Sequence, residues 1–289
     1  MIFDETLQLA NGVHIPVFGL GTWFIEDKDA ADAVRAAAQI GYRLFDTAQA
    51  YGNEAGVGEG IRTCGISRDK LFVTSKVAAE HKDYQSAKAS IDATLEKMGL
   101  DYLDLMIIHS PQPWKVVNQS ENRYFAENVE VWKALEDAYL AGKLRAIGVS
   151  NFLQEDLDNI IKHCGTKPMV DQVLCHVGHT PAALLDYCKT QGIQVEAYAP
   201  IAHGAAMNIG AVQEISHKYN VTVPQLYLRY DLQLGTVVLP KTANPDHMKS
   251  NAAVDFTISD ADMETLKNVH YDDYGAAGKF PVFGGKYKG

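Results

Sequence analysis

The sequence predicts an α/β fold, a single closed (β/α)8 barrel, because short apolar runs typical of buried strands alternate with helical patterns along the chain. Eight such units occur without a Gly/Ser-rich or charged linker, so we expect one domain over residues 1–289. A doubly wound sheet is the competing architecture. It normally needs a G-x-G-x-x-G motif after its first strand, whereas Gly56, Gly58 and Gly60 have another spacing and lie within a helical pattern.

Each element follows from its local pattern. Apolar, β-rich runs predict strands at 18–22, 43–46, 71–76, 103–109, 146–150, 169–173, 194–198 and 237–239. Helical patterns between and after these runs predict helices at 28–40, 54–63, 84–98, 129–141, 154–162, 181–190, 210–219, 223–234 and 245–252.

Three further segments lie outside the regular alternation. Residues 7–18 (LQLANGVHIPVF) predict a hairpin with Asn-Gly at its turn, which we expect to plug the N-terminal mouth of the barrel. Residues 110–128 and 271–289 exceed ordinary loop length, and such loops are usually functional or disordered. The first follows the fourth strand directly, so we expect it to cover the cleft at the C-terminal ends of the strands.

Composition narrows the class of protein. The net charge of −10 is spread along the chain without a basic run, which disfavours binding to nucleic acid or an anionic membrane. We expect neither a secretory signal nor a membrane span. Cys64, Cys164, Cys175 and Cys188 show no C-x-x-C spacing, which indicates reduced thiols and a cytoplasmic location.

Three consecutive apolar runs each end on an ionisable residue: Asp46, Lys76 and His109. Since the C-terminal ends of neighbouring parallel strands face one cleft, an acid, a base and an imidazole should meet there. Tyr51 follows Asp46 on the same loop. This constellation is typical of proton-transfer chemistry.

Asp46-Thr-Ala-Gln-Ala-Tyr51-Gly-Asn-Glu54, followed by Lys76 and His109 at strand ends, resembles the aldo-keto reductase superfamily. Other matching motifs are Gly19-Leu-Gly-Thr-Trp23, Gly148-Val-Ser-Asn-Phe152, Ala197-Tyr-Ala-Pro200 and Leu239-Pro-Lys-Thr242. They occur in family order, so the resemblance covers nearly the whole chain. It implies a TIM barrel without a Rossmann fold that reduces an aldehyde or ketone to an alcohol with NAD(P)H.

The resemblance also implies a role for each of the four residues. Carbonyl reduction needs a hydride at carbon and a proton at oxygen. Tyr51 would be the general acid, and His109 would orient the carbonyl oxygen. A tyrosine with a pKa of about 10 is a weak acid, and a nearby Lys76 ammonium, paired with Asp46, would lower that pKa.

Structural interpretations remain open for each residue alone: packing for Tyr51, an ion pair for Asp46 and Lys76, a core histidine for His109. Their coincidence at one face of three successive strands favours catalysis. As a different class of protein, a cofactor-binding regulatory subunit with incidental reductase activity is the alternative. We expect a monomer, a small carbonyl substrate and no metal.

Cofactor residues follow from the same resemblance. They would hold NADPH, with NADH also plausible, and are Thr22, Trp23, Asp46, Ser150, Asn151, Gln172, Tyr198, Ala199, Pro200, Ile201, Lys241, Thr242, His247 and Asn251. Ser150, Asn151 and Gln172 resemble the groups that hold the carboxamide, and Tyr198 the ring that stacks on the nicotinamide. A helix N-cap or a polar strand end is the alternative for Asn151 and Thr242.

Several positions depart from the family pattern. His247 stands where many members carry an Arg that binds a 2′-phosphate bidentately, so we expect a relaxed preference between NADPH and NADH. Ala199 replaces a frequent Ser and removes one possible hydrogen bond. Ala78 and Ser110 stand where many members carry Trp, which predicts a wider or more polar substrate pocket.

The expected substrate-binding residues are Trp23, Tyr51, His109, Ser110 and Trp114. The lost aromatic wall could instead be supplied by Trp114, Phe280, Phe283 and Tyr287.

Overall fold

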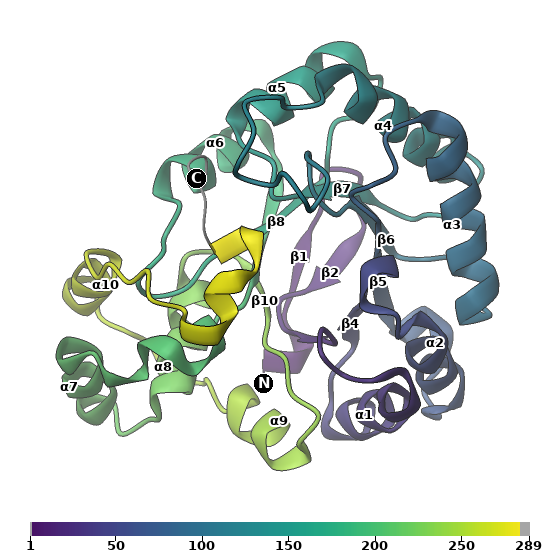
Figure 1. The fold of residues 1–289 in the computed structure, drawn as a ribbon. Coiled ribbons are helices and arrows are strands. Elements are labelled where there is room, and N and C mark those ends of the chain that lie inside the picture. The colour runs from purple at the N-terminus through teal and green to yellow at the C-terminus, as the bar shows by residue number, and fades with distance from the viewer. Residues whose placement is uncertain (1, 284–289) are drawn as a thin grey trace.

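The computed structural model describes residues 2–283, in which eight parallel strands form a nearly closed barrel surrounded by helices (Figure 1). Strand order in the sheet follows chain order, and isolated bridges from Phe18 to Val238 and from Gly21 to Lys241 join the first strand to the last. The predicted fold class is therefore confirmed. The strands are β3 Gly19–Gly21, β4 Leu44–Asp46, β5 Phe72–Val77, β6 Leu105–Ile108, β7 Ile147–Ser150, β8 Val170–Leu174, β9 Gln194–Tyr198 and β10 Val237–Leu239.

The helices of the outer layer start and end close to the predicted positions, with two exceptions. They are α1 Asp27–Ile40, α2 Glu54–Thr63, α3 Tyr84–Met98, α4 Phe125–Leu140, α5 Gln154–His163, α6 Ala182–Gln191, α7 Gly210–Lys218, α8 Val223–Gln233, α9 Pro245–Ala252 and α10 Asp260–Lys267. Helix α4 begins four residues earlier than predicted, because Asn128 donates to the carbonyls of Pro111 and Arg123 and so binds this turn to the preceding loop. Helix α10 was not predicted, although Ser259 provides its N-cap.

The predicted hairpin is present at the N-terminal end of the barrel. Strands β1 (Thr6–Gln8) and β2 (His14–Pro16) pair antiparallel, and Ile15 in β2 is fully buried. Asn11 at the turn donates to the carbonyl of Arg145, which precedes β7, at 2.9 Å. In Figure 1 the hairpin is seen in the middle of the ring of helices.

Parallel register brings the last residues of the strands to the opposite end. Gly21 pairs with Asp46, and Ser150 pairs with Gln172 on the next strand. Long β-rich apolar runs bury these strands on both faces, so polar side chains are concentrated where the strands end. None of the helices within residues 2–283 combines the length and apolar character that a membrane crossing requires.

Two covering segments lie over this C-terminal end. The first covering segment, residues 109–124, connects β6 to α4. The second, residues 268–283, contains the 3-10 helices η5 (Gly275–Lys279) and η6 (Pro281–Phe283) and is the yellow end of the chain in Figure 1. Both agree with the predicted long loops, and Tyr287 lies outside the described residues.

Candidate active site

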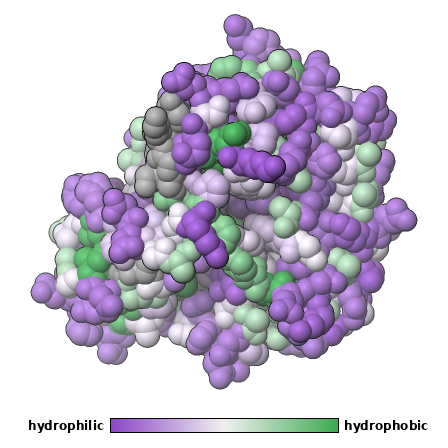
Figure 2. Space-filling model, in the orientation of Figure 1, coloured by the Kyte–Doolittle hydropathy of each residue, from purple (hydrophilic) through white to green (hydrophobic). Residues whose placement is uncertain are grey.

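A cavity of about 410 Å³ opens at the C-terminal end of the barrel. Asp46, Tyr51 and His109 line its floor, and Trp23 and Trp114 line its walls. The face shown in Figure 2 is hydrophilic around its edge, with paler and more hydrophobic residues toward the middle. The cavity therefore combines a polar floor with aromatic walls.

A buried ion pair lies below the floor. Lys76 Nζ donates to Asp46 Oδ1 at 2.5 Å and to the carbonyl oxygen of Thr47 at 2.8 Å. Lys76 is fully buried and contributes no atoms to the cavity lining. Because an unpaired buried ammonium is very costly, Asp46 is the group that allows Lys76 to lie there charged.

Tyr51 stands at the end of the 3-10 helix η2 (Gln49–Tyr51), between two aromatic side chains. Its ring centroid is 6.3 Å from that of Trp23 and 5.5 Å from that of His109. Lys76 Nζ lies 5.0 Å from the Tyr51 ring centroid. Burial and the Asp46 charge raise the pKa of Tyr51 well above its usual value, which is opposite to the direction that we expected from Lys76.

His109 follows β6 directly and is buried in the floor. Burial, together with the Lys76 charge, lowers the pKa of His109 well below its usual value, so the imidazole is neutral near pH 7. Within residues 2–283, its buried Nδ1 has no hydrogen-bond partner. The Trp114 ring packs edge-on against it, with centroids 4.8 Å apart.

A row of polar side chains continues from His109 along the next strands. Asn151 donates through Nδ2 to the carbonyl of His109 and to Ser150 Oγ, both at 3.0 Å. Tyr198 donates its hydroxyl to Asn151 Oδ1 at 2.7 Å. Asn151 has a left-handed backbone (φ 61°), and the N-cap of α5 is Leu153, so the helix-cap alternative for Asn151 is excluded.

Gln172 bonds directly to the ion pair and also to Glu196, an acid that the sequence patterns did not single out. Its Nε2 donates to Asp46 Oδ2 at 2.9 Å and to Glu196 Oε2 at 2.8 Å. Burial and the Asp46 charge raise the pKa of Glu196 to about 7. Glu196 lies in the middle of β9, where nothing in the sequence alone indicates that its side chain faces the barrel interior.

Most of the predicted cofactor residues meet at the cavity. Those that line it are Thr22, Trp23, Asp46, Ser150, Asn151, Gln172, Tyr198, Ala199, Pro200, Ile201 and Lys241. Thr242, His247 and Asn251 are not in the lining and follow Lys241 on the segment leading into α9 and on α9 itself. Thr242 Oγ1 accepts from the backbone N–H of Asn244 at 3.0 Å, and Asn244 is the N-cap of α9, so Thr242 does not cap this helix.

The expectation that Ser110 lines the substrate space needs correction. Ser110 is fully buried outside the cavity lining, because its Oγ accepts from the backbone N–H of Gln112 and its carbonyl accepts from Lys82. Ala78 also lies outside the lining, where its N–H donates to Gln49. Trp114 and Phe280 supply the aromatic wall that these two positions lack.

Two further lining residues contact Trp23: His203, which was not predicted, and Phe280, which was expected as a possible source of the aromatic wall. His203, on the 3-10 helix η4 (Ala202–Asn208), packs edge-on against Trp23 with centroids 5.5 Å apart. Phe280 packs against Trp23 at 4.9 Å. Phe283 is not in the lining and contacts His203 instead, at 5.0 Å. Only the tertiary arrangement of loops distant in sequence brings these rings together.

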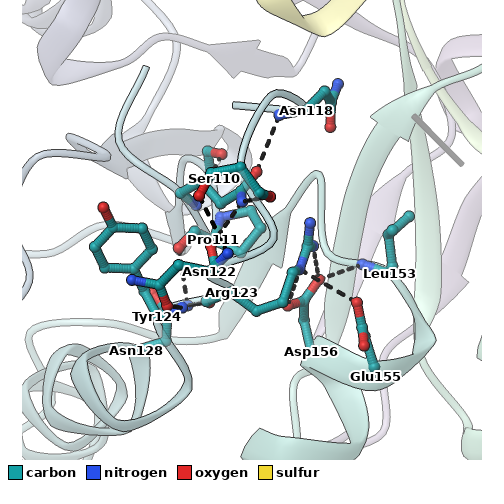
Figure 3. A network of polar contacts seen from close by, with 12 residues as sticks. Ser110, Pro111, Asn118, Asn122, Arg123, Tyr124, Asn128, Leu153, Glu155 and Asp156 are labelled. Atoms are coloured by element: carbon teal, nitrogen blue, oxygen red, sulfur yellow. Dashed lines mark hydrogen bonds and ion pairs between the residues drawn. The ribbon is translucent and has the colours of Figure 1, made fainter. Parts of the chain in front are cut away.

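A polar network holds the first covering segment in place (Figure 3). Gln112 Nε2 donates to the carbonyls of Ser120 and Asn122 at 2.8 and 2.7 Å, and its Oε1 accepts from the N–H of Asn118 at 2.9 Å. An ion pair between buried Arg123 and Asp156 joins the segment to α5. Trp114 is therefore presented by a loop whose shape is fixed by its own hydrogen bonds.

The same segment is bonded to two other parts of the chain. Lys82 donates to the carbonyls of Ser110 and Pro111 at 3.2 and 3.0 Å, and burial lowers the pKa of Lys82 to about 8. Asn118 Nδ2 donates to the carbonyl of Pro281 at 3.2 Å. This last bond connects the two covering segments.

The arrangement of this site on a (β/α)8 barrel agrees with a family-level match. A model of the aldo/keto reductase family matches residues 17–270. The chain belongs to the aldo/keto reductase family. Members of this family are oxidoreductases that act on small carbonyl compounds with NAD(P)H.

Individual aldo/keto reductases match over nearly the whole chain. Glyoxal reductase of Bacillus subtilis (strain 168) is 41% identical over 271 residues, covering 93% of this chain and 94% of that relative. The 9,11-endoperoxide prostaglandin H2 reductase of Trypanosoma cruzi (strain CL Brener) is 37% identical, covering 92% of each chain.

Solved structures of aldo-keto reductases are also similar to this chain. An aldo/keto reductase from Brucella melitensis has a TM-score of 0.84 at 34% identity, covering 91% of this chain and 98% of that one. A Bombyx mori aldo-keto reductase solved in complex with NADP has a TM-score of 0.82 at 27% identity, covering 91% and 92%.

Proposed function

We propose that this aldo/keto reductase reduces an aldehyde or ketone to its alcohol with NAD(P)H, and that Tyr51 donates the proton. The observation that carries the proposal is the meeting of Tyr51, neutral His109 and the buried Lys76–Asp46 pair at the floor of one cavity. A proton donor, an oxygen-orienting group and a buried cation are the groups that stabilise charge developing on a carbonyl oxygen.

The cavity suits a nicotinamide cofactor on its polar side. Ser150, Asn151 and Gln172 offer a hydroxyl and two amides along one edge, and no donor in the described part of the chain reaches Gln172 Oε1. These three residues would hold the carboxamide, and Tyr198 would pack on the ring. When bound, NAD(P)H supplies the hydride that adds to the carbonyl carbon.

Tyr51 suits proton donation although its pKa is raised. An alkoxide is a much stronger base than a phenolate, so the phenol can still give up its proton as the alkoxide develops. The Lys76 ammonium, 5.0 Å from the Tyr51 ring centroid, would stabilise the phenolate that remains. Asp46 keeps that ammonium charged and fixed.

His109 would donate a hydrogen bond to the carbonyl oxygen. A neutral imidazole carries one N–H, and an N–H on the unpartnered, buried Nδ1 would be costly. The proton therefore belongs on Nε2. The Trp114 ring packs edge-on against this imidazole.

The walls favour a substrate with an apolar substituent. Trp23, Phe24, Trp114, Phe280 and Val282 line the cavity. Burial of apolar substrate area against such walls would stabilise binding, whereas the hydroxyl groups of a polyhydroxylated chain would find few hydrogen-bond partners there. Short aldehydes and dicarbonyls also belong in the first substrate panel, because one relative is a glyoxal reductase.

Replacement of Tyr51 by Phe tests the catalytic proposal. We expect kcat to fall by about 10²- to 10⁴-fold, the usual contribution of a general acid, while the affinity for NADPH is unchanged. Tyr84→Phe is the matched control, since the Tyr84 hydroxyl binds Asp137 far from the cavity. Full carbonyl-dependent oxidation of NADPH by Tyr51→Phe would refute the assignment.

We further propose a relaxed choice between NADPH and NADH. Lys241 and the exposed His247 would lie at the adenosine-phosphate end, and His247 lacks the bidentate fork of an arginine.

The four cysteines are free thiols, which supports the proposed cytoplasmic location.

A further inference from the structure

We infer that Glu196 is a positioning residue for the cofactor, because it holds the Gln172 amide with its carbonyl oxygen toward the cavity. This inference rests on the proposed function and adds to it a residue that does not line the cavity. Glu196 acts through Gln172 and has no direct contact with the reacting groups.

Strand register places the two side chains together. In the parallel pair β8–β9, Gln172 lies directly opposite Glu196, and both point into the barrel. Gln172 Nε2 donates to Asp46 Oδ2 at 2.9 Å and to Glu196 Oε2 at 2.8 Å. A primary amide has two N–H hydrogens, and these two bonds use both of them. The Oε1 atom is left as the group that Gln172 offers to the cavity.

Packing alone does not explain an acid at this position. Glu196 is fully buried, and its Oε1 has no partner among residues 2–283. Burying a carboxyl group with one oxygen unpaired costs free energy that an apolar side chain on β9 would avoid. Within residues 2–283 the one side-chain hydrogen bond that Glu196 makes goes to Gln172, so positioning this amide is the function that the geometry assigns to it.

The charged groups that act on Glu196 come from two other strands, Asp46 on β4 and Lys76 on β5. Asp46 accepts from Gln172 with one oxygen and from Lys76 with the other. The four side chains thus form one continuous hydrogen-bonded chain across the barrel interior. Loss of Glu196 would leave one Gln172 N–H buried without an acceptor and would free the amide to rotate.

The effect should be specific to the nicotinamide part of the cofactor. An acceptor at Gln172 Oε1 matches the amino group of a carboxamide, whereas the phosphates and the adenosine would be held elsewhere. A nucleotide without nicotinamide, 2′-phospho-ADP-ribose, should therefore bind equally well whether or not Gln172 is held in place. A general loss of order in the barrel would instead weaken the binding of both nucleotides.

The experiment measures Kd for NADPH and for 2′-phospho-ADP-ribose by quenching of intrinsic tryptophan fluorescence. Glu196→Leu should raise the Kd for NADPH about tenfold, the usual effect of one unsatisfied buried hydrogen bond, without changing that for 2′-phospho-ADP-ribose. Glu196→Gln keeps an acceptor oxygen and should bind NADPH within about twofold of wild type. Asp231→Asn is the control, because Asp231 is a fully buried acid on α8 that contacts Cys175 and does not line the cavity.

Three results would overturn the inference. They are unchanged NADPH binding by Glu196→Leu, equal weakening of both nucleotides, or a Glu196→Gln variant as weak as Glu196→Leu. If Glu196→Leu does not fold, Glu196→Asp withdraws the carboxylate by one methylene and should show the same NADPH-specific loss. Failure of the proposed function would instead appear in wild type, as no NADPH binding or no turnover of any carbonyl.

Discussion

The floor and the walls of the cavity are built differently. Below and beside the floor, side chains from neighbouring strands form a hydrogen-bonded chain that runs from Lys76 through Asp46 to Gln172 and Glu196. The walls are aromatic rings on loops, such as Trp114 and Phe280, which meet their neighbours through ring contacts. The comparison teaches that the ion pair and the amide proposed to support the reaction sit on barrel strands, whereas Tyr51 itself and the surface that a substrate would meet sit on connecting segments.

The two regions also respond to change in different ways. In this hydrogen-bonded chain Lys76, Asp46 and Gln172 depend on buried partners, so removing one side chain leaves another unpaired. In the walls, replacing an aromatic side chain by a smaller one loses only the apolar contact area of its ring. The following predictions test this difference, from the largest expected effect to the smallest.

Lys76→Met should have the largest effect. It leaves the Asp46 carboxylate buried without its cation, which should lower the free energy of unfolding by about 3–5 kcal/mol and kcat by at least about 100-fold. Urea denaturation and steady-state kinetics measure the two losses. Lys133→Met is the control, because Lys133 pairs with Glu130 at the surface, where its loss should cost far less stability than the loss of Lys76. Equal costs for the two variants would contradict a special dependence of the floor on buried partners.

Glu196 should make stability depend on pH. Its pKa is raised from 4.5 to about 7 in the folded protein, so between these values the folded state holds a proton that the unfolded state has lost. Stability should therefore fall as pH rises from 4.5 to 7, by on the order of 3 kcal/mol from this group.

Urea denaturation at a series of pH values measures that decrease. In Glu196→Gln the part of this decrease that is due to Glu196 should disappear. The stability of the variant relative to wild type should therefore increase as pH rises. A constant difference between the two proteins from pH 4.5 to 8 would contradict this.

Trp114→Ala should change recognition more than chemistry. Loss of the ring should raise KM for an aldehyde with an aromatic substituent by about tenfold, while kcat changes little, because apolar contact area is lost from substrate and transition state alike. A short aldehyde that does not reach the wall is the matched control and should show no change. A large fall in kcat for both substrates would show that Trp114 also holds His109 in its catalytic position.

His247→Arg should have the smallest effect. An arginine at the first turn of α9 could bind a 2′-phosphate bidentately, so the ratio of kcat/KM for NADPH over NADH should rise by about fivefold. His217→Arg, at an exposed site on α7, controls for added charge. An unchanged ratio would place the 2′-phosphate away from α9.

The same comparison explains what the sequence could predict. Asp46, Lys76 and His109 were predictable because each ends a buried strand, and the ends of parallel strands must meet. The position of the first covering segment was predictable from its length and place, but its inner structure was not. Ser110 lies outside the cavity lining because its hydroxyl oxygen accepts a hydrogen bond from the backbone N–H of Gln112. That contact depends on the folded shape of the loop, which the sequence does not specify.

Two other residues illustrate the limits. Glu196 was missed because an acid in a short strand looks like any half-exposed residue until strand register places it opposite Gln172. His203 reaches the lining from a 3-10 helix with left-handed residues, for which hydrophobic periodicity gives no signal.

The hydrogen bond from Asn118 to Pro281 joins residues 163 positions apart and has a consequence for protein engineering. Exchange of either covering segment for that of a relative would remove one partner of this bond, so a chimera that transfers only one segment would also disturb the other. To change the substrate range of this barrel, both covering segments should therefore be exchanged together.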